Sequence, residues 1–152
     1  MLSNRFLYDS NLRQVFDPAL QDYKIPDYDY RMLRNASKIH YDVEYLSVAK
    51  NYPAFPVEGV ILGNQRLLIN LCCRKDDQGD TDTSPWINVM FILNTCSPTT
   101  FLSKHAIEKL GGSRDIPTLV NIHSDSLLWA YPASPQSQFT ELNILGMDFL
   151  TM

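Results

Sequence analysis

The feature that most restricts the fold is a series of short apolar runs after residue 56, each bounded by turn residues. Runs of about four to eight β-branched, aromatic or aliphatic residues between Gly, Pro, Asn and Asp predict strands rather than helices. This part of the chain is therefore predicted to be mostly β. The expected strands are Val57–Leu62, Arg66–Cys73, Trp86–Leu93, Thr118–Ile122 and Leu127–Tyr131.

The connections between these strands carry their own signals. A Gly63-Asn64 turn predicts a hairpin between the first two strands, and the segment HSDS (123–126) joins the last two. Ser103 or a neighbour begins a short helix in SKHAIEKL, which Gly111 ends as a C-cap glycine does. The closing segment ELNILGMDFLTM is expected to contain a terminal helix.

The segment RKDDQGDTDTSP (74–85) is predicted to be a solvated loop with four aspartates. It lacks the Asp-x-Asp-x-Asp-Gly order and the distal bidentate Glu of a calcium loop. We therefore predict no metal site here, and no cofactor for the chain as a whole. The four carboxylates are Asp76, Asp77, Asp80 and Asp82.

Composition changes near residues 51–56. Seven of the eight tyrosines lie before Pro53, whereas all six glycines follow it. This shift predicts a Tyr-rich N-terminal extension (1–52) and a β-rich domain (53–152). The tyrosines are most simply explained by packing onto that domain.

Two elements are expected in the extension. Ser10 could cap a short helix through Phe16, ended by the Asp17-Pro18 step. The alternation of apolar and polar residues over Ile39–Tyr45 favours a half-buried strand. A helix that places Tyr41, Tyr45, Val48 and Ala49 on one face is the alternative.

Charge and cysteine content exclude several classes of function. The net charge of −4 does not provide the clustered basic residues of a nucleic-acid-binding protein. Apolar runs are too short to span a bilayer, and charged residues interrupt the first 20 positions, so neither a membrane partner nor secretion is expected. Three cysteines, Cys72, Cys73 and Cys96, form neither a disulfide framework nor a zinc motif. These features favour an intracellular protein, cytoplasmic or nuclear.

Two motifs carry a family resemblance. The stretch FILNTCSPTTFLS (91–103) is followed about fifty residues later by LNILGMDFL (142–150). The ordered pair resembles the retropepsins, the retroviral and retrotransposon-type aspartic proteases, from about Phe55 to the end. The resemblance implies a retropepsin-like acid-protease half-barrel in which Val89–Leu93 delivers the loop to the floor of a cleft. Asn143–Leu145 would pass beside it, with Gly146 permitting close backbone approach.

The position of the catalytic aspartate is Asn94, and the following family glycine is Cys96. Aspartic proteases need two carboxylates that share one proton, and an amide cannot take a proton from water. We therefore expect no catalytic residue in the loop Asn94-Thr95-Cys96. One alternative is an active endopeptidase whose aspartate has been replaced by Asn94. Another is a Cys96 nucleophile with His105 or His123, although histidines on helices or hairpins are more often structural.

The flap and the dimer are the remaining expectations from the resemblance. Family members cover the substrate with a glycine-tipped hairpin, whereas the stretch Gly111–Leu142 is short and has glycines only at its start. One domain supplies half of the family's active site, which implies a two-fold homodimer in which the Thr95 hydroxyl locks the loops together. The chain ends directly after the expected terminal helix, so we expect a dimer only if the N-terminal extension supplies the missing sheet or packs across the two-fold axis.

The functional hypothesis is a non-catalytic, retropepsin-like protein-binding or dimerisation module. Its partner is expected to be a protein or peptide, or a second copy of the chain. The predicted cleft or dimer contacts are Asn94, Thr95, Ser97 and Gly146.

Overall fold

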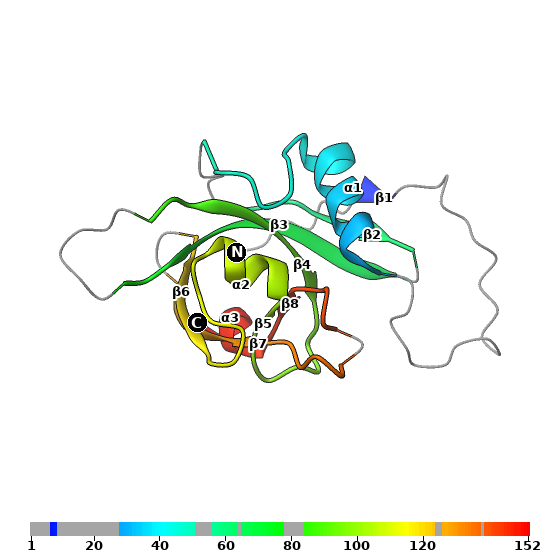
Figure 1. Cartoon of the computed structure of the whole chain (residues 1–152). Coiled ribbons are helices and arrows are strands. Elements are labelled where there is room, and N and C mark those ends of the chain that lie inside the picture. Colours follow the sequence, from blue (N-terminus) through cyan, green and yellow to red (C-terminus); the bar gives the residue numbers. More distant parts are fainter. Residues whose placement is uncertain are drawn as a thin grey trace.

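The computed structural model of the chain is mostly β, with a mixed sheet and a few short helices (Figure 1). It describes residues 7–8, 28–50, 56–63, 65–77, 84–123, 126–137 and 139–152. The helices are α1 (Tyr30–Tyr41), α2 (Lys104–Lys109) and α3 (Met147–Leu150). The strands are β1 (Leu7–Tyr8), β2 (Gly59–Leu62), β3 (Arg66–Lys75), β4 (Ile87–Leu93), β5 (Phe101–Leu102), β6 (Thr118–Ile122), β7 (Ser126–Pro132) and β8 (Ile144–Leu145).

The sheet closes on itself. Its eight strands follow the order β1-β2-β3-β4-β8-β5-β7-β6, and β6 also pairs with β3. The ten-residue β3 makes this possible: Leu68 to Cys73 pair with β4, while the last three residues of β3 pair with β6. The strands from β3 through β4, β8, β5, β7 and β6 back to β3 therefore form a closed ring, with β2 and β1 extending from it. Closing a sheet in this way removes most of its exposed edges.

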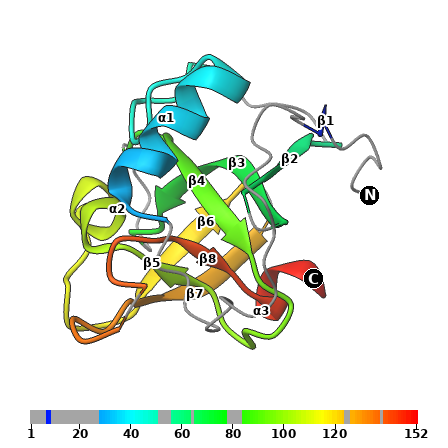
Figure 2. The ribbon, with the colours of Figure 1, turned by 90° about the vertical axis from the view of Figure 1, so that its right-hand side faces the viewer.

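The central strands β3 and β4 are buried on both faces. All residues of β4 except Leu93 are buried, as are the six central residues of β3. One face points into the ring, and α1 lies against β4 from outside, as both ribbon views show (Figures 1 and 2). A strand covered on both sides has near-continuous apolar sequence, which explains why INVMFIL lacks alternation.

The prediction of a strand at Ile39–Tyr45 is wrong, because the helix α1 extends through Tyr41. The Asp29 carboxylate caps the helix by accepting the backbone N–H of Met32, and Leu33 and Ala36 form its buried side. The helix ends at Tyr41 because Asp42 adopts the left-handed conformation (φ 52°). The alternative helix through Ala49 is also wrong, since residues 42–50 form an irregular segment whose backbone bonds to Trp86 and Asn88 along the edge of β4.

The described part of the N-terminal extension packs into the same core as the β-rich part. The Tyr28 hydroxyl donates to the carbonyl of Leu62 at 2.7 Å, and Leu33 and Tyr45 are buried members of the core. The tyrosines at 28 and 45 therefore have packing roles. The predicted boundary between residues 52 and 53 and the helix expected at Ser10–Phe16 lie outside the described residues.

The strand predictions after residue 56 are confirmed. β2 and β3 form the expected antiparallel hairpin, β4 covers Trp86–Leu93 but for its first residue, and β6 and β7 match the last two predicted strands. Ser103 caps α2 by accepting the N–H of Ala106, and Gly111 follows the helix with φ 75°. No helix in the part of the chain that the structure describes is long and apolar enough to cross a membrane.

Candidate functional site

The loop that follows β4 lies beside β8. The two strands run parallel, with Ile92 opposite Ile144 and Leu93 opposite Leu145. The pairing continues into the loop, because the N–H of Asn94 donates to the carbonyl of Leu145 at 3.0 Å. The segment Asn143–Leu145 thus passes beside the end of β4, which is the placement that the family resemblance implied.

The loop itself is a tight turn centred on Asn94. The side-chain Oδ1 of Asn94 accepts the backbone N–H of Cys96 at 3.0 Å, and its carbonyl accepts the N–H of Ser97 at 3.1 Å. The Ser97 hydroxyl donates to the carbonyl of Thr99. Asn94 is partly exposed, whereas Thr95 and Cys96 are exposed at the tip. An amide oxygen that caps its own turn is a common use of Asn and stabilises the loop without any charge.

Gly146 is a point where the two segments approach closely. A Cβ atom at this position would lie 2.3 Å from the carbonyl oxygen of Thr99 and 2.4 Å from its carbonyl carbon. Backbone atoms cannot move aside as a side chain can. The N–H of Gly146 also donates to the Thr100 hydroxyl at 3.1 Å. The close approach expected from the sequence is therefore confirmed.

Asp148 connects the terminal helix to the loop. Its carboxylate accepts the backbone N–H of Thr100 at 2.9 Å and the Thr100 hydroxyl at 2.7 Å, in addition to the N–H of Phe149. The backbone of α3 is held by the same loop, since Met147 donates to the carbonyl of Ser97. This carboxylate therefore holds two distant segments together. The sequence analysis did not identify this pairing of Asp148 with Thr100.

A buried amide behind the loop was also missed. Asn143 is fully buried, and its Oδ1 accepts the N–H of Ser103 at 2.9 Å. Its Nδ2 donates to the Tyr45 hydroxyl at 2.6 Å and to the carbonyl of Met90 at 3.0 Å. Burial raises the pKa of Tyr45 to about 12. The one sequence signal was a polar residue inside the apolar run LNIL.

The two candidate histidines have other surroundings. His105 on α2 packs against Tyr30, with ring centroids 4.7 Å apart, and burial lowers the pKa of its imidazole. His123 is buried, and its Nδ1 accepts the backbone N–H of Cys72 at 3.3 Å. These contacts are with residues other than Cys96, so the geometry adds no support to a Cys96–histidine pair.

The β6–β7 hairpin belongs to the ring. Ile122 at its tip pairs with Cys73 of β3, and Tyr131 at its other end pairs with Phe101 of β5. A hairpin held at both ends is part of the wall and cannot close as a lid does. Residues 124–125 of the connection HSDS lie outside the described residues.

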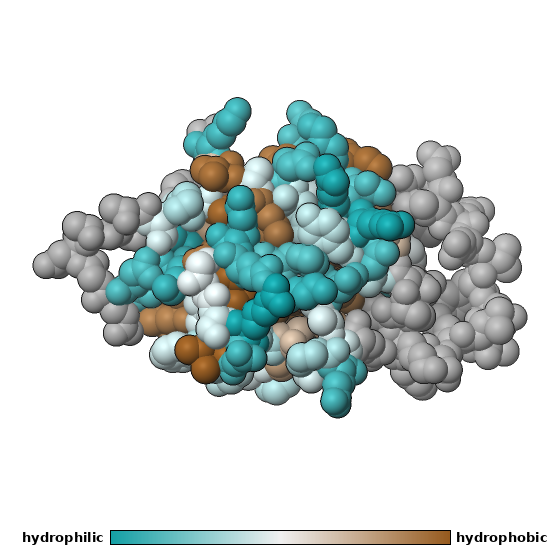
Figure 3. All heavy atoms as spheres, viewed as in Figure 1, coloured by the Kyte–Doolittle hydropathy of each residue, from teal (hydrophilic) through white to brown (hydrophobic). Residues whose placement is uncertain are grey.

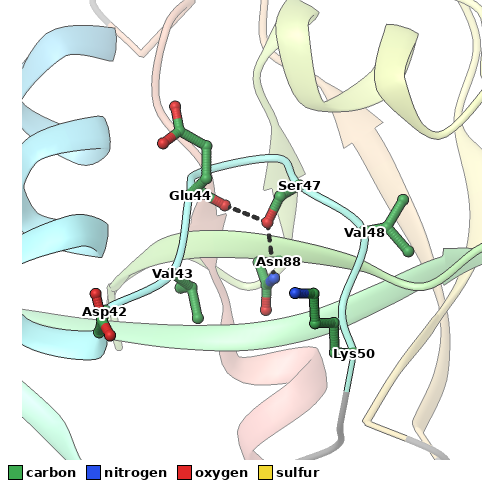
Figure 4. Close-up of a pocket in the computed structure, with 7 residues that line it drawn as sticks. All are labelled: Asp42, Val43, Glu44, Ser47, Val48, Lys50 and Asn88. Carbon is green, nitrogen blue, oxygen red and sulfur yellow. Dashed lines mark hydrogen bonds between the residues drawn. The ribbon is translucent and has the colours of Figure 1, made fainter.

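A separate pocket of about 400 Å³ lies under the irregular segment that follows α1 (Figure 4). Asn88 at its base donates to the Ser47 hydroxyl at 3.1 Å, and Ser47 donates to the carbonyl of Glu44. Asn88 and Asn94 are six residues apart on or next to one strand, which places the pocket about 20 Å from the loop. The lining residues are Asp42, Val43, Glu44, Ser47, Val48, Lys50 and Asn88.

The two carboxylates of this pocket are already engaged in ion pairs. Asp42 pairs with Lys38 at 2.8 Å, and Glu44 pairs with Arg34 at 3.1 Å. The pocket therefore offers no unpaired carboxylate. Among the residues that the structure describes, no group of three or more His, Cys, Asp or Glu side chains could hold a metal ion, and Asp80 and Asp82 lie outside them.

Comparison with known proteins adds no relative. No protein-family model, no curated protein and no solved structure matches the chain.

Proposed function

We propose that this protein is a non-catalytic, retropepsin-like module that binds a protein or peptide through the loop of residues 94–97. The observation that supports this most strongly is the turn in which the Asn94 amide caps the N–H of Cys96 at the end of β4. The parallel β4–β8 pair and the close approach at Gly146 support a retropepsin-like arrangement around it. The loop is thus compatible with a retropepsin-like backbone arrangement, with the Asn94 amide at the position of the catalytic aspartate.

Peptide hydrolysis at this loop would require an ionisable pair. An amide can donate and accept hydrogen bonds but neither binds nor releases a proton in the working range of an enzyme. Asp148 is the acid bonded to the loop, and its carboxylate is occupied by the N–H and hydroxyl of Thr100. Among the residues that the structure describes, Asp148 is therefore not available as a substitute for the missing acid.

Binding a partner requires hydrogen-bonding groups at the loop but no ionisable pair. The Asn94 Nδ2 group and the exposed Thr95 hydroxyl offer uncharged hydrogen-bonding groups at the tip. Where the partner is a second copy, two Asn94 amides can face each other across a two-fold axis without the repulsion that two carboxylates create. The loop contact alone is small beside the roughly 1,200–2,000 Å² of a stable interface, so a strong dimer needs further surface.

The test is a cleavage assay on a peptide library between about pH 3 and pH 7, the range in which carboxylates titrate. We expect no cleavage by the natural chain and none by the Asn94→Asp variant, because Cys96 remains and the β6–β7 hairpin is held in the ring. Cleavage by the natural chain that disappears in Asn94→Ala would overturn the proposal. Strong cleavage by Asn94→Asp alone would favour the alternative of a protease whose aspartate was replaced.

A further inference from the structure

The outer face of β7 carries three large exposed side chains in alternate positions. Leu127, Trp129 and Tyr131 are 44%, 53% and 40% exposed, whereas Leu128 and Ala130 between them are buried. Alternate residues of a strand point to the same side, so the three form one continuous row. Exposed apolar residues are ordinary when scattered and informative when contiguous.

The neighbouring strands extend this row into a patch. Leu119 and Asn121 of β6 lie directly opposite Trp129 and Leu127, and Phe101 of β5 lies beside Tyr131 with ring centroids 6.2 Å apart. Residues in register share a face of the sheet. The β7 face, defined here as these six residues, contains no acidic or basic side chain. Arg74 beside Asn121 marks its border and stacks on Trp86 at 4.5 Å.

Other parts of the surface differ from the β7 face. The side of the molecule seen in Figure 3 is mostly hydrophilic, and its apolar residues form small separate groups. The helix α1 packs against β4, and residues 46–49 bond along an edge of that strand, whereas Trp129 in the β7 row remains half exposed. Trp and Tyr are the residues that most often contribute binding energy at protein interfaces.

We propose that the β7 face is a self-association surface that packs against the same face of a second copy. The whole chain carries a net charge of −4, so two copies approach most easily where neither presents a charge. An uncharged sheet face is also self-complementary, since two such faces pack about 10 Å apart with interdigitating side chains. A partner recognised by opposite charge has nothing to bind here.

The apolar area buried between two β7 faces indicates how strong the dimer contact is. With about 150–250 Å² per fully exposed large side chain, the exposed fractions of the three residues sum to roughly 300 Å² per copy. Two copies then bury roughly 600 Å² of apolar surface, or about 1,000 Å² in total if apolar atoms supply about 60% of the interface. This is below the standard size of a stable complex, so the dimer should be weak and dependent on concentration.

This surface is separate from the loop at Asn94, so its test must distinguish the two. Sedimentation equilibrium of the full chain from roughly 5 to 500 µM covers the range expected of such weak contacts. The natural chain should show a reversible monomer–dimer equilibrium, and Trp129→Lys should weaken it by about 30-fold, as loss of an interface hot spot does. The matched control is Ile39→Lys, which places the same charge on α1 at an apolar residue that is 74% exposed.

Circular dichroism establishes that each variant is folded, and Leu127→Lys replaces Trp129→Lys if the latter is not. Equal dimerisation of the Trp129 and Ile39 variants, or a natural chain that stays monomeric throughout, overturns the inference. A dimer that is lost in Asn94→Ala and kept in Trp129→Lys also overturns it, while leaving the proposed function intact.

Discussion

The substitution Gly146→Ala tests whether the contact between the loop and β8 holds the fold together. The new methyl group would lie 2.3 Å from the Thr99 oxygen and 3.0 Å from the nitrogen of Thr100. Both are backbone atoms, so relief requires the loop to move. Movement would also stretch the bonds from Gly146 and Asp148 to Thr100.

The expected cost follows from these two effects. Overpacking costs about 1–3 kcal/mol, and weakened buried hydrogen bonds add about 0.5–1.5 kcal/mol each, which gives roughly 3–5 kcal/mol in the free energy of unfolding. A domain of this size is stable by only about 5–15 kcal/mol. In a urea titration the midpoint should therefore fall by about 2 M, for a slope of about 2 kcal/mol per M.

Gly111→Ala is the matched control. Gly111 has φ 75°, but no atom lies within 4 Å of the position of a Cβ atom there. The substitution loses only the ability of glycine to adopt a positive φ without strain, which costs about 1 kcal/mol. The urea midpoint should therefore fall by about 0.5 M. If Gly146→Ala is no more destabilising than Gly111→Ala, the close approach does not stabilise the fold and the reasoning is wrong.

Two further predictions concern the N-terminal extension. Burial raises the pKa of Tyr45 from 10.0 to about 12, so the unfolded chain loses this proton near pH 10 and the folded chain only near pH 12. Its contribution of roughly 2–3 kcal/mol is therefore present below pH 10 and lost as pH rises to about 12. Urea midpoints measured across this range should fall less in Tyr45→Phe, and an equal fall in both proteins would contradict the assignment. A fragment of residues 53–152 lacks the buried Tyr28, Leu33 and Tyr45, so it should be less soluble and less stable than the full chain; equal urea midpoints would show that the extension is not part of the core.

Most strands and the helix α2 could be predicted because the residues that determine them lie within each element or directly beside it. Turn residues and short apolar runs placed β2, β3, β4, β6 and β7 within a residue or two. The serine and glycine that flank α2 act within one turn of chain. The end of β4, the loop at Asn94 and the segment beside it also followed from two short motifs.

The helix α1 shows where a local signal misleads. Alternation over residues 39–45 favoured a strand, yet capping by Asp29 and the buried spacing of Leu33 and Ala36 start a helix earlier. The helix then runs through Tyr41 and includes the first three of the seven alternating residues, 39–41. Packing against β4 decides between the two patterns, and a seven-residue window contains no information about that packing.

Only the tertiary structure decided which distant groups meet. Asp148 bonds Thr100 across 48 residues and Asn143 bonds Tyr45 across 98, and neither pairing leaves a periodic trace in the sequence. Ring closure between β3 and β6 likewise depends on one long strand, β3, whose last three residues pair with β6. The absence of an acid at position 94 was determined by the sequence alone, because it depends on residue identity. The hydrogen-bond partners of that loop, and the exposure of Trp129 on β7, depend on how the ring closes.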